Sequence, residues 1–171
     1  MDLFYNKRHE NTARFSKSDV NRNEENSRRY LPMVQLIVGQ KGKGKTTVIL
    51  NKVNEEIKSA KGNIVFLDKN AQHMFELNNK IRLIDVSNYD ISNADQFTGF
   101  IAGIISQDHD LQTMYLDGFM KCAKLEGKDI TPTVQKIDRL SQMFDVDFVI
   151  SVSMDKAELP EELQEKVLIA L

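Results

Sequence analysis

One eight-residue motif limits what this chain can fold into more than any other feature: Gly39-Gln40-Lys41-Gly42-Lys43-Gly44-Lys45-Thr46. It matches the phosphate-binding pattern G-x-x-x-x-G-K-[ST] without a gap. The apolar run at residues 33–38 predicts a buried strand before it, and residues 46–60 predict a helix after it. A glycine-rich loop in that position directs backbone N–H groups and the positive end of a helix dipole at an anion. The motif therefore predicts an α/β domain that binds phosphate groups.

The residues of this loop have separate parts in holding a nucleoside triphosphate. Lys45 is predicted to reach the β- and γ-phosphates, and the Thr46 hydroxyl is predicted to ligate Mg²⁺. A lysine-rich turn that matches the pattern by chance is the alternative, and the strand and helix on either side argue against it. We expect ATP and Mg²⁺ as cofactors. The predicted nucleotide-binding residues are Gly39, Gln40, Lys41, Gly42, Lys43, Gly44, Lys45, Thr46 and Thr47.

A carboxylate near the metal is the second part that such a site needs. Asp117 is the best candidate, because it ends the apolar strand predicted at residues 112–116 and follows Thr46 by 71 residues. The carboxyl ends of parallel strands meet at one edge of a sheet, so Asp117 and the loop are expected to lie together. We predict Lys45 and Asp117 as catalytic residues, and Thr46 and Asp117 as metal ligands. A simple helix N-cap is the alternative for Asp117.

In the additional-strand class of phosphate-loop ATPases, which this order of motifs resembles, a glutamate commonly follows the aspartate and polarises water. Here the next residue is Gly118, which predicts slow hydrolysis. Asp68 and Asp85 also end predicted strands, and either could supply the base or form a turn. Ser151 and Ser153 stand where such ATPases often sense the γ-phosphate, although ending the strand is the simpler interpretation.

Several motifs of other phosphate-loop proteins are absent. No Asn-Lys-x-Asp specifies guanine, and no Asp-x-x-Gly follows residue 116, which argues against a regulatory GTPase. Small-molecule kinases usually surround the transferred phosphoryl group with arginines. After residue 31 the only arginines are Arg82 and Arg139, so a kinase is disfavoured.

The bulk composition argues against other classes of function. The chain has 171 residues, of which 28% are charged and 41% hydrophobic, and its formal net charge is −2. The lack of a basic excess argues against nucleic acid as a partner, and no apolar run approaches the roughly 18 residues of a membrane span. Cys122 is the only cysteine, which predicts a reducing, cytoplasmic location. His9, His73 and His109 are too scattered to predict a metal site.

Two regions of the chain differ in composition. Residues 1–31 are rich in asparagine and in mixed charge and poor in apolar residues, so we expect a disordered polar tail. Across residues 32–171, short apolar runs alternate with helical patterns. This predicts one nucleotide-binding domain of class α/β, with the three-layer fold of P-loop NTPases and a mostly parallel sheet of five to six strands.

The elements of this domain follow from periodicity and from start and stop residues. The predicted strands are residues 33–38, 63–67, 80–86, 112–116, 148–152 and 167–171. The predicted helices are residues 46–60 and 71–78, one opened by a capping box of Ser92 and Asp95, one of about ten residues between Asp117 and Gly127, one capped by Thr131, and one beginning near Pro160.

Further short segments carry a family resemblance. They are residues 33–46, Gly99-Phe-Ile-Ala-Gly103, Leu116-Asp-Gly-Phe119, Ser151-Val-Ser153 and Glu158-Leu-Pro160. In these the chain resembles the short P-loop ATP-binding proteins of Firmicutes that are often labelled twitching-motility-like. The resemblance implies ATP binding and does not cover residues 1–31. The arginine fingers and the acidic and histidine boxes of true pilus-retraction ATPases have no counterpart here.

A shorter resemblance gives an enzyme alternative. Gly42-Lys-Gly-Lys-Thr-Thr47 is similar to the loop of ATP:corrinoid adenosyltransferases, although those enzymes typically carry an acidic residue after the second aspartate, and tryptophans that this chain lacks. The function favoured by the sequence is a slow ATPase or nucleotide switch that a protein partner or a homo-oligomer activates. An ATP-binding module without turnover is the further alternative.

Overall fold

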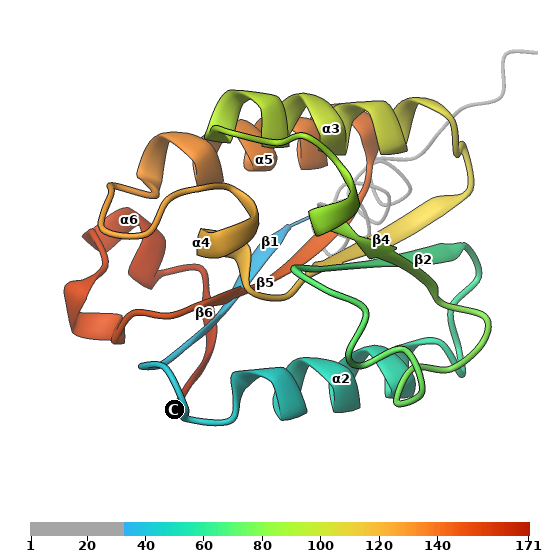
Figure 1. Ribbon diagram of the computed structural model, residues 1–171, viewed down its shortest axis with the longest axis horizontal. Helices are drawn as coiled ribbons and strands as arrows, with labels where there is room; N and C mark the ends of the chain where they lie inside the picture. Colours follow the sequence, from blue (N-terminus) through green and yellow to red (C-terminus); the bar gives the residue numbers. More distant parts are fainter. Residues whose placement is uncertain (1–32) are drawn as a thin grey trace, which may run out of the picture. The chain divides into compact units, whose positions relative to one another are not determined.

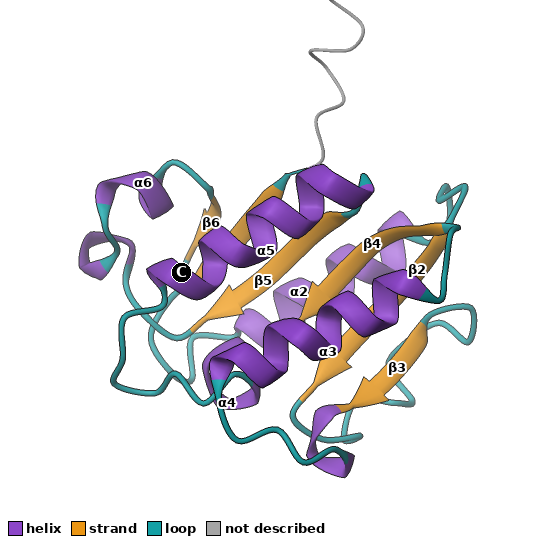
Figure 2. Cartoon of the chain, turned by 90° about the horizontal axis from the view of Figure 1, so that it is seen from above, coloured by secondary structure: helices purple, strands orange, loops and turns teal. Residues whose placement is uncertain are grey.

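The computed structural model describes residues 33–171, so the tail predicted at residues 1–31 lies outside the described residues. Residues 33–171 form an open sheet of six strands, all of them parallel (Figure 2). The sheet order is β3-β2-β4-β5-β1-β6. The strands are β1 (Val34–Val38), β2 (Asn63–Asp68), β3 (Arg82–Asp85), β4 (Leu111–Leu116), β5 (Asp147–Val152) and β6 (Val167–Ala170).

Helices cover both faces of this sheet, which gives three layers (Figure 1). On one face lies α2 (Lys45–Glu56), and on the other lie α3 (Ala94–Ser106) and α5 (Thr131–Phe144). Each helix packs inward because its apolar residues recur at a spacing of three and four. The connections carry the shorter η1 (Val86–Asn88), α4 (Phe119–Cys122), η2 (Lys156–Glu158) and α6 (Glu161–Gln164). The predicted α/β three-layer fold, with its parallel sheet of five to six strands, is confirmed.

The strand order brings four chain segments to one edge of the sheet. β5 lies between β1 and β4, with Val38 opposite Val152 and Leu116 opposite Ile150. Beyond β4 lies β2, in which Leu67 pairs with Leu116. The carboxyl ends of β1, β5, β4 and β2 are therefore nearly level, and the residues that follow these strands face one another. One strand, β5, separates β1, which leads into the phosphate loop, from β4, which Asp117 follows.

Four sequence predictions about helices are wrong in detail. The helix after Asp117 has only four residues, because the chain leaves helical geometry again at Lys124, whose φ is +57°. Residues 71–77 form successive turns instead of a helix. The N-cap of α3 is Asn93, whose side chain accepts a hydrogen bond from Gln96 N, and α5 already begins at Thr131.

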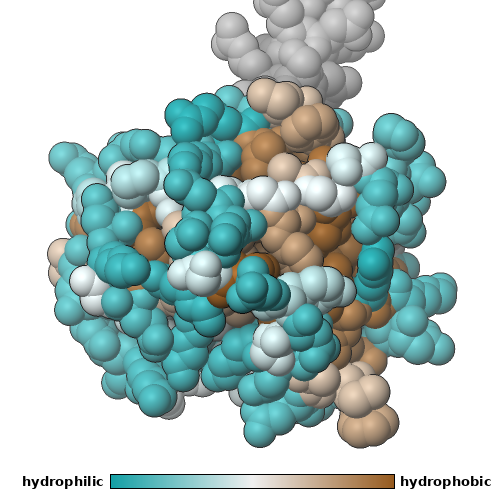
Figure 3. Space-filling view, turned by 45° about the horizontal axis from the view of Figure 1, so that its top comes forward, coloured by the Kyte–Doolittle hydropathy of each residue, from teal (hydrophilic) through white to brown (hydrophobic). Residues whose placement is uncertain are grey.

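The outer surface of α3 and α5 carries a shallow apolar groove. Its volume is about 470 Å³, and Gly99, Ala102, Leu140 and Met143 contribute to its walls. Met143 is 70% exposed, and Figure 3, in which this face comes forward, shows apolar surface between hydrophilic flanks.

No helix within residues 33–171 is both long and apolar enough to cross a membrane.

Candidate nucleotide site

The phosphate loop leads directly into the first turn of α2. Gly44 is the N-cap residue, and its φ of +87° lies in the left-handed region that glycine adopts without strain. No side chain caps this end of α2, so the first N–H groups of the helix and the dipole behind them are free to meet an anion. The loop thus has the geometry that the sequence motif predicts.

Lys45 is the first residue of α2 and folds back over the loop. Its ammonium donates hydrogen bonds to the carbonyl oxygens of Gly39 at 2.6 Å and Gln40 at 2.9 Å. Burial lowers the pKa of Lys45, while the nearby carboxylates of Asp117 and Asp155 act in the opposite direction. A partly desolvated cation among oxygen acceptors is well placed to exchange those carbonyls for the oxygens of a phosphate.

The first half of the loop is anchored to the connection between β5 and β6. The Gln40 amide donates to Asp155 Oδ2 and to Glu158 Oε2, both at 3.0 Å, and Gly39 N donates to the Met154 carbonyl at 2.8 Å. Gln40 occupies an unspecified position of the motif, so this anchor could not be read from the pattern. The hydrogen bonds of Gln40 to Asp155 and Glu158 fix the position of the loop.

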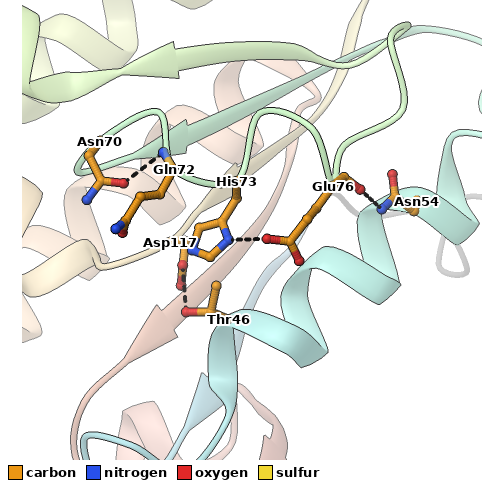
Figure 4. Close-up of polar contacts among 7 residues, drawn as sticks. All are labelled: Thr46, Asn54, Asn70, Gln72, His73, Glu76 and Asp117. Atoms are coloured by element: carbon orange, nitrogen blue, oxygen red, sulfur yellow. Dashed lines mark hydrogen bonds and ion pairs between the residues drawn. The ribbon is translucent and has the colours of Figure 1, made fainter.

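Thr46 and Asp117 come together across the sheet edge. The Thr46 hydroxyl donates to Asp117 Oδ2 at 2.9 Å (Figure 4). Because Gly118 is the N-cap of α4, the interpretation of Asp117 as a simple N-cap is wrong. A hydroxyl and a carboxylate side by side are the hard oxygen donors that Mg²⁺ prefers, so this pair fits a magnesium ion.

Ser151 fixes the other side of the Asp117 carboxylate. Its hydroxyl donates to Asp117 Oδ1 at 2.5 Å and accepts from Gly118 N at 3.0 Å. Ser151 lies within β5 and is buried, whereas Ser153 follows the strand and is exposed. The simpler interpretation, that both serines end the strand, is therefore wrong for Ser151, which positions a site carboxylate.

A cavity of about 530 Å³ opens in front of these residues. Five predicted loop residues line it, together with Asp117, Ser151 and Ser153; the five are Lys41, Gly42, Gly44, Lys45 and Thr46. Of the remaining predicted loop residues, Gly39 and Gln40 accept hydrogen bonds from Lys45 through their carbonyl oxygens. Lys43 and Thr47 are exposed and do not line the cavity.

Three further charged residues line this cavity that sequence reasoning did not find: Lys69, Lys121 and Glu126. They lie after β2, in α4 and in the connection to α5. The Glu126 carboxylate thus lines the cavity from a position nine residues after Asp117, whereas the residue next to Asp117 is Gly118. Neither arginine of the described region lines the cavity; Arg139 lies on the α3–α5 groove.

Gly118 has a left-handed backbone conformation and lies against the stem of Lys69. A Cβ atom at Gly118 would lie 3.4 Å from Lys69 Cδ and 3.8 Å from Lys69 Cβ and Cγ. Gly118 also has a φ of +61°, which disfavours any larger residue. The stem of Lys69 therefore lies against the backbone position that directly follows Asp117.

The other two strand-end carboxylates differ from each other. Asp68 is buried beside Asp117; its Oδ1 accepts from Lys69 N at 2.6 Å, and its Oδ2 has no partner among the described residues. Burial, followed by the negative charge of Asp117, raises the pKa of Asp68. Asp85 instead accepts from the backbone and hydroxyl of Ser87, so Asp85 is a turn residue.

The connection after β2 is held next to α2 by hydrogen bonds. Asn54 donates to the Glu76 carbonyl at 2.7 Å, and His73 Nδ1 lies 2.7 Å from Glu76 Oε1 (Figure 4). Asn54 also accepts from Asn78 N at 2.8 Å. His73 belongs to no group of potential metal ligands in residues 33–171.

Comparison with models of known protein families gave no match, and a search among proteins of curated function found no significant relative. The resemblances to twitching-motility-like ATP-binding proteins and to adenosyltransferases therefore stay predictions. The geometry around Lys45, Thr46 and Asp117 is what bears on function.

Proposed function

We propose that this protein binds Mg·ATP and acts as a slow or partner-activated ATPase or nucleotide switch. The observation that carries the proposal is the contact between Thr46 Oγ1 and Asp117 Oδ2 at 2.9 Å. It joins the end of the phosphate loop to a carboxylate 71 residues away, on a strand that is not adjacent to β1. A chance lysine-rich turn has no reason to be accompanied by such a pair.

Each residue then has a defined part. The loop and the N-terminus of α2 supply N–H groups to the phosphates, and Lys45 supplies a positive charge. Thr46 and Asp117 would hold Mg²⁺, which neutralises charge on the phosphate oxygens when bound. Ser151 keeps Asp117 aimed at Thr46, and Asp155 and Glu158 hold the loop through Gln40.

Slow turnover is proposed because two usual groups are missing from the cavity wall. Gly118 stands in place of a glutamate, and no arginine of the described region lines the cavity. Glu126 is the carboxylate best placed to polarise water, because it lines the cavity and is exposed. An arginine supplied in trans accelerates such sites by about 10³–10⁵. Such an arginine would come from a protein partner or from a second copy of the chain.

The reaction products separate this function from its alternatives. An ATPase releases ADP and phosphate, an adenosyltransferase releases tripolyphosphate and only with a reduced corrinoid, and a binding module releases neither. We expect slow phosphate release that stops in Asp117→Asn. Turnover above about 10 s⁻¹, the median for enzymes, would contradict the proposal, and tripolyphosphate release would establish the adenosyltransferase alternative.

A cytoplasmic location is also proposed, because Cys122 is a buried free thiol and the sole cysteine.

A further inference from the structure

We propose that a second site, for a small molecule bearing an oxyanion group, lies directly beside the nucleotide cavity. The site is a cavity of about 220 Å³ between η1 and the end of α4. Its walls include Lys69, Lys121, Lys124, Ser87 and Tyr89. The proposal goes beyond the proposed function, and it rests on that function only in taking Mg·ATP as the ligand of the neighbouring cavity.

The charge of this second cavity selects an anion. Three lysines line it, and no carboxylate does. None of the three ammonium groups forms an ion pair or a hydrogen bond within residues 33–171, so all three are available to a ligand. Three cationic side chains around one cavity make its electrostatic potential positive, which favours an anionic ligand.

The backbone around the cavity is fixed in ways that favour a binding site over a loose surface. Asp85 accepts hydrogen bonds from Ser87 N at 2.9 Å and Ser87 Oγ at 2.6 Å, which sets the turn that forms one wall. The Tyr89 ring packs on Phe100 with centroids 4.6 Å apart, and its hydroxyl has no hydrogen-bond partner among the described residues. Tyr89 can therefore donate to a bound anion.

Lys124 lines only the second cavity. Its φ of +57° is the left-handed geometry that commonly ends a helix, with Lys124 N donating to the Lys121 carbonyl at 3.2 Å and Leu125 N to the Met120 carbonyl at 2.7 Å. This conformation ends α4 and sets the backbone from which Lys124 lines the second cavity. The helix end thus positions Lys124 at this cavity and not at the nucleotide cavity.

The two cavities share part of their walls. Lys69 and Lys121 line both, and the stem of Lys69 lies over Gly118, next to Asp117. An oxyanion in the second cavity would therefore lie beside the nucleotide cavity, with two lysines between them. This placement suits a co-substrate or effector that carries a phosphate or carboxylate group.

The test uses the full chain, saturated with Mg²⁺ and a non-hydrolysable ATP analogue, and titrates inorganic phosphate or malonate by calorimetry. We expect one saturable anion site per chain. Lys124→Gln should weaken its affinity about tenfold or more, as loss of one charge-assisted bond does. Lys61→Gln, which removes an exposed lysine outside both cavities, should leave it unchanged, and neither variant should change analogue affinity. Tighter binding of phosphate identifies a phosphorylated ligand, and tighter binding of malonate identifies a carboxylate.

Absence of saturable anion binding, or equal binding by wild type and Lys124→Gln, would overturn the second site. If the ATP analogue itself does not bind, the proposed function fails separately. The anion titrations are then made on the nucleotide-free wild type and Lys124→Gln, where the same difference is expected. Tyr89→Phe gives a second variant that removes only a hydroxyl and should weaken anion binding without affecting the fold.

Discussion

Ser151→Ala should damage both the stability of the domain and its affinity for Mg·ATP, although Ser151 is not expected to touch the nucleotide. The Ser151 hydroxyl donates to Asp117 Oδ1 and accepts from Gly118 N. Alanine fills nearly the same space and removes both hydrogen bonds. The Asp117 carboxylate then keeps only its contact with Thr46, and the Gly118 N–H group loses its acceptor.

The size of the effect follows from the two bonds. A hydrogen bond to a charged group is worth about 1.5–3 kcal/mol, and a buried donor left without a partner costs about 1–3 kcal/mol. Because Gly118 is only half-buried, water can partly replace the serine, so we expect a total loss of about 2–3 kcal/mol in the free energy of unfolding. For a domain near this size, that corresponds to a Tm lower by about 4–12 °C. Loss of a group that orients a metal ligand lowers metal affinity by about 10–100-fold.

The assay combines thermal unfolding with calorimetric titration of Mg·ATP. Ser153→Ala is the matched control, because Ser153 lines the same cavity without a hydrogen bond to Asp117. It should change the free energy of unfolding by no more than about 0.5 kcal/mol. If Ser151→Ala and Ser153→Ala behave alike in both measurements, Ser151 does not position Asp117 and the reasoning is refuted.

Three further predictions follow from the site and the chain. In nucleotide-free protein, Asp68→Asn should raise the Tm at pH 7 by about 2–4 °C, or about 1 kcal/mol. The pKa of Asp68 is raised, which means that its ionised form destabilises the fold, so the gain in Tm should disappear as the pH falls below the ordinary aspartate range. A gain in Tm that does not depend on pH would contradict this cause. Glu126→Gln should lower ATP turnover about 100-fold, as loss of a general base does, with unchanged ATP affinity; unchanged turnover in a phosphate-release assay would exclude Glu126 as the base. Deletion of residues 1–30 should leave the Tm within about 2–4 °C and ATP affinity unchanged, and a larger drop would place the domain boundary before residue 31.

The sequence was sufficient for the architecture and for the centre of the site. The loop motif needs a strand before it and a helix after it, and alternation of apolar runs with helical patterns needs a parallel sheet. Once the sheet is parallel, residues that follow its strands share an edge, so the proximity of Asp117 to Thr46 could be expected. The sequence could not decide between Asp68 and Asp85, because burial and hydrogen-bond partners depend on the connections that follow.

Those connections also hold what the sequence did not predict. Lys69, Lys121 and Glu126 reach the cavity from segments without hydrophobic periodicity, where the backbone conformation is set by tertiary contacts. The left-handed conformation of Lys124, which shortens α4, has no sequence signal, since lysine does not favour it. Only Gly118 offered a hint, because a glycine directly after a strand-end carboxylate indicates a special backbone angle or a close neighbour.

The central claim is that residues 39–46 hold the phosphates of ATP through Lys45. Calorimetric titration of Mg·ATP into wild type, Lys45→Ala and Lys61→Ala tests it most directly. Removing the ammonium should cost about 1.5–3 kcal/mol, or about ten- to hundredfold in Kd, while Lys61→Ala, which alters an exposed lysine away from the cavity, should bind as wild type does. Equal ATP affinity of wild type and Lys45→Ala would contradict the account.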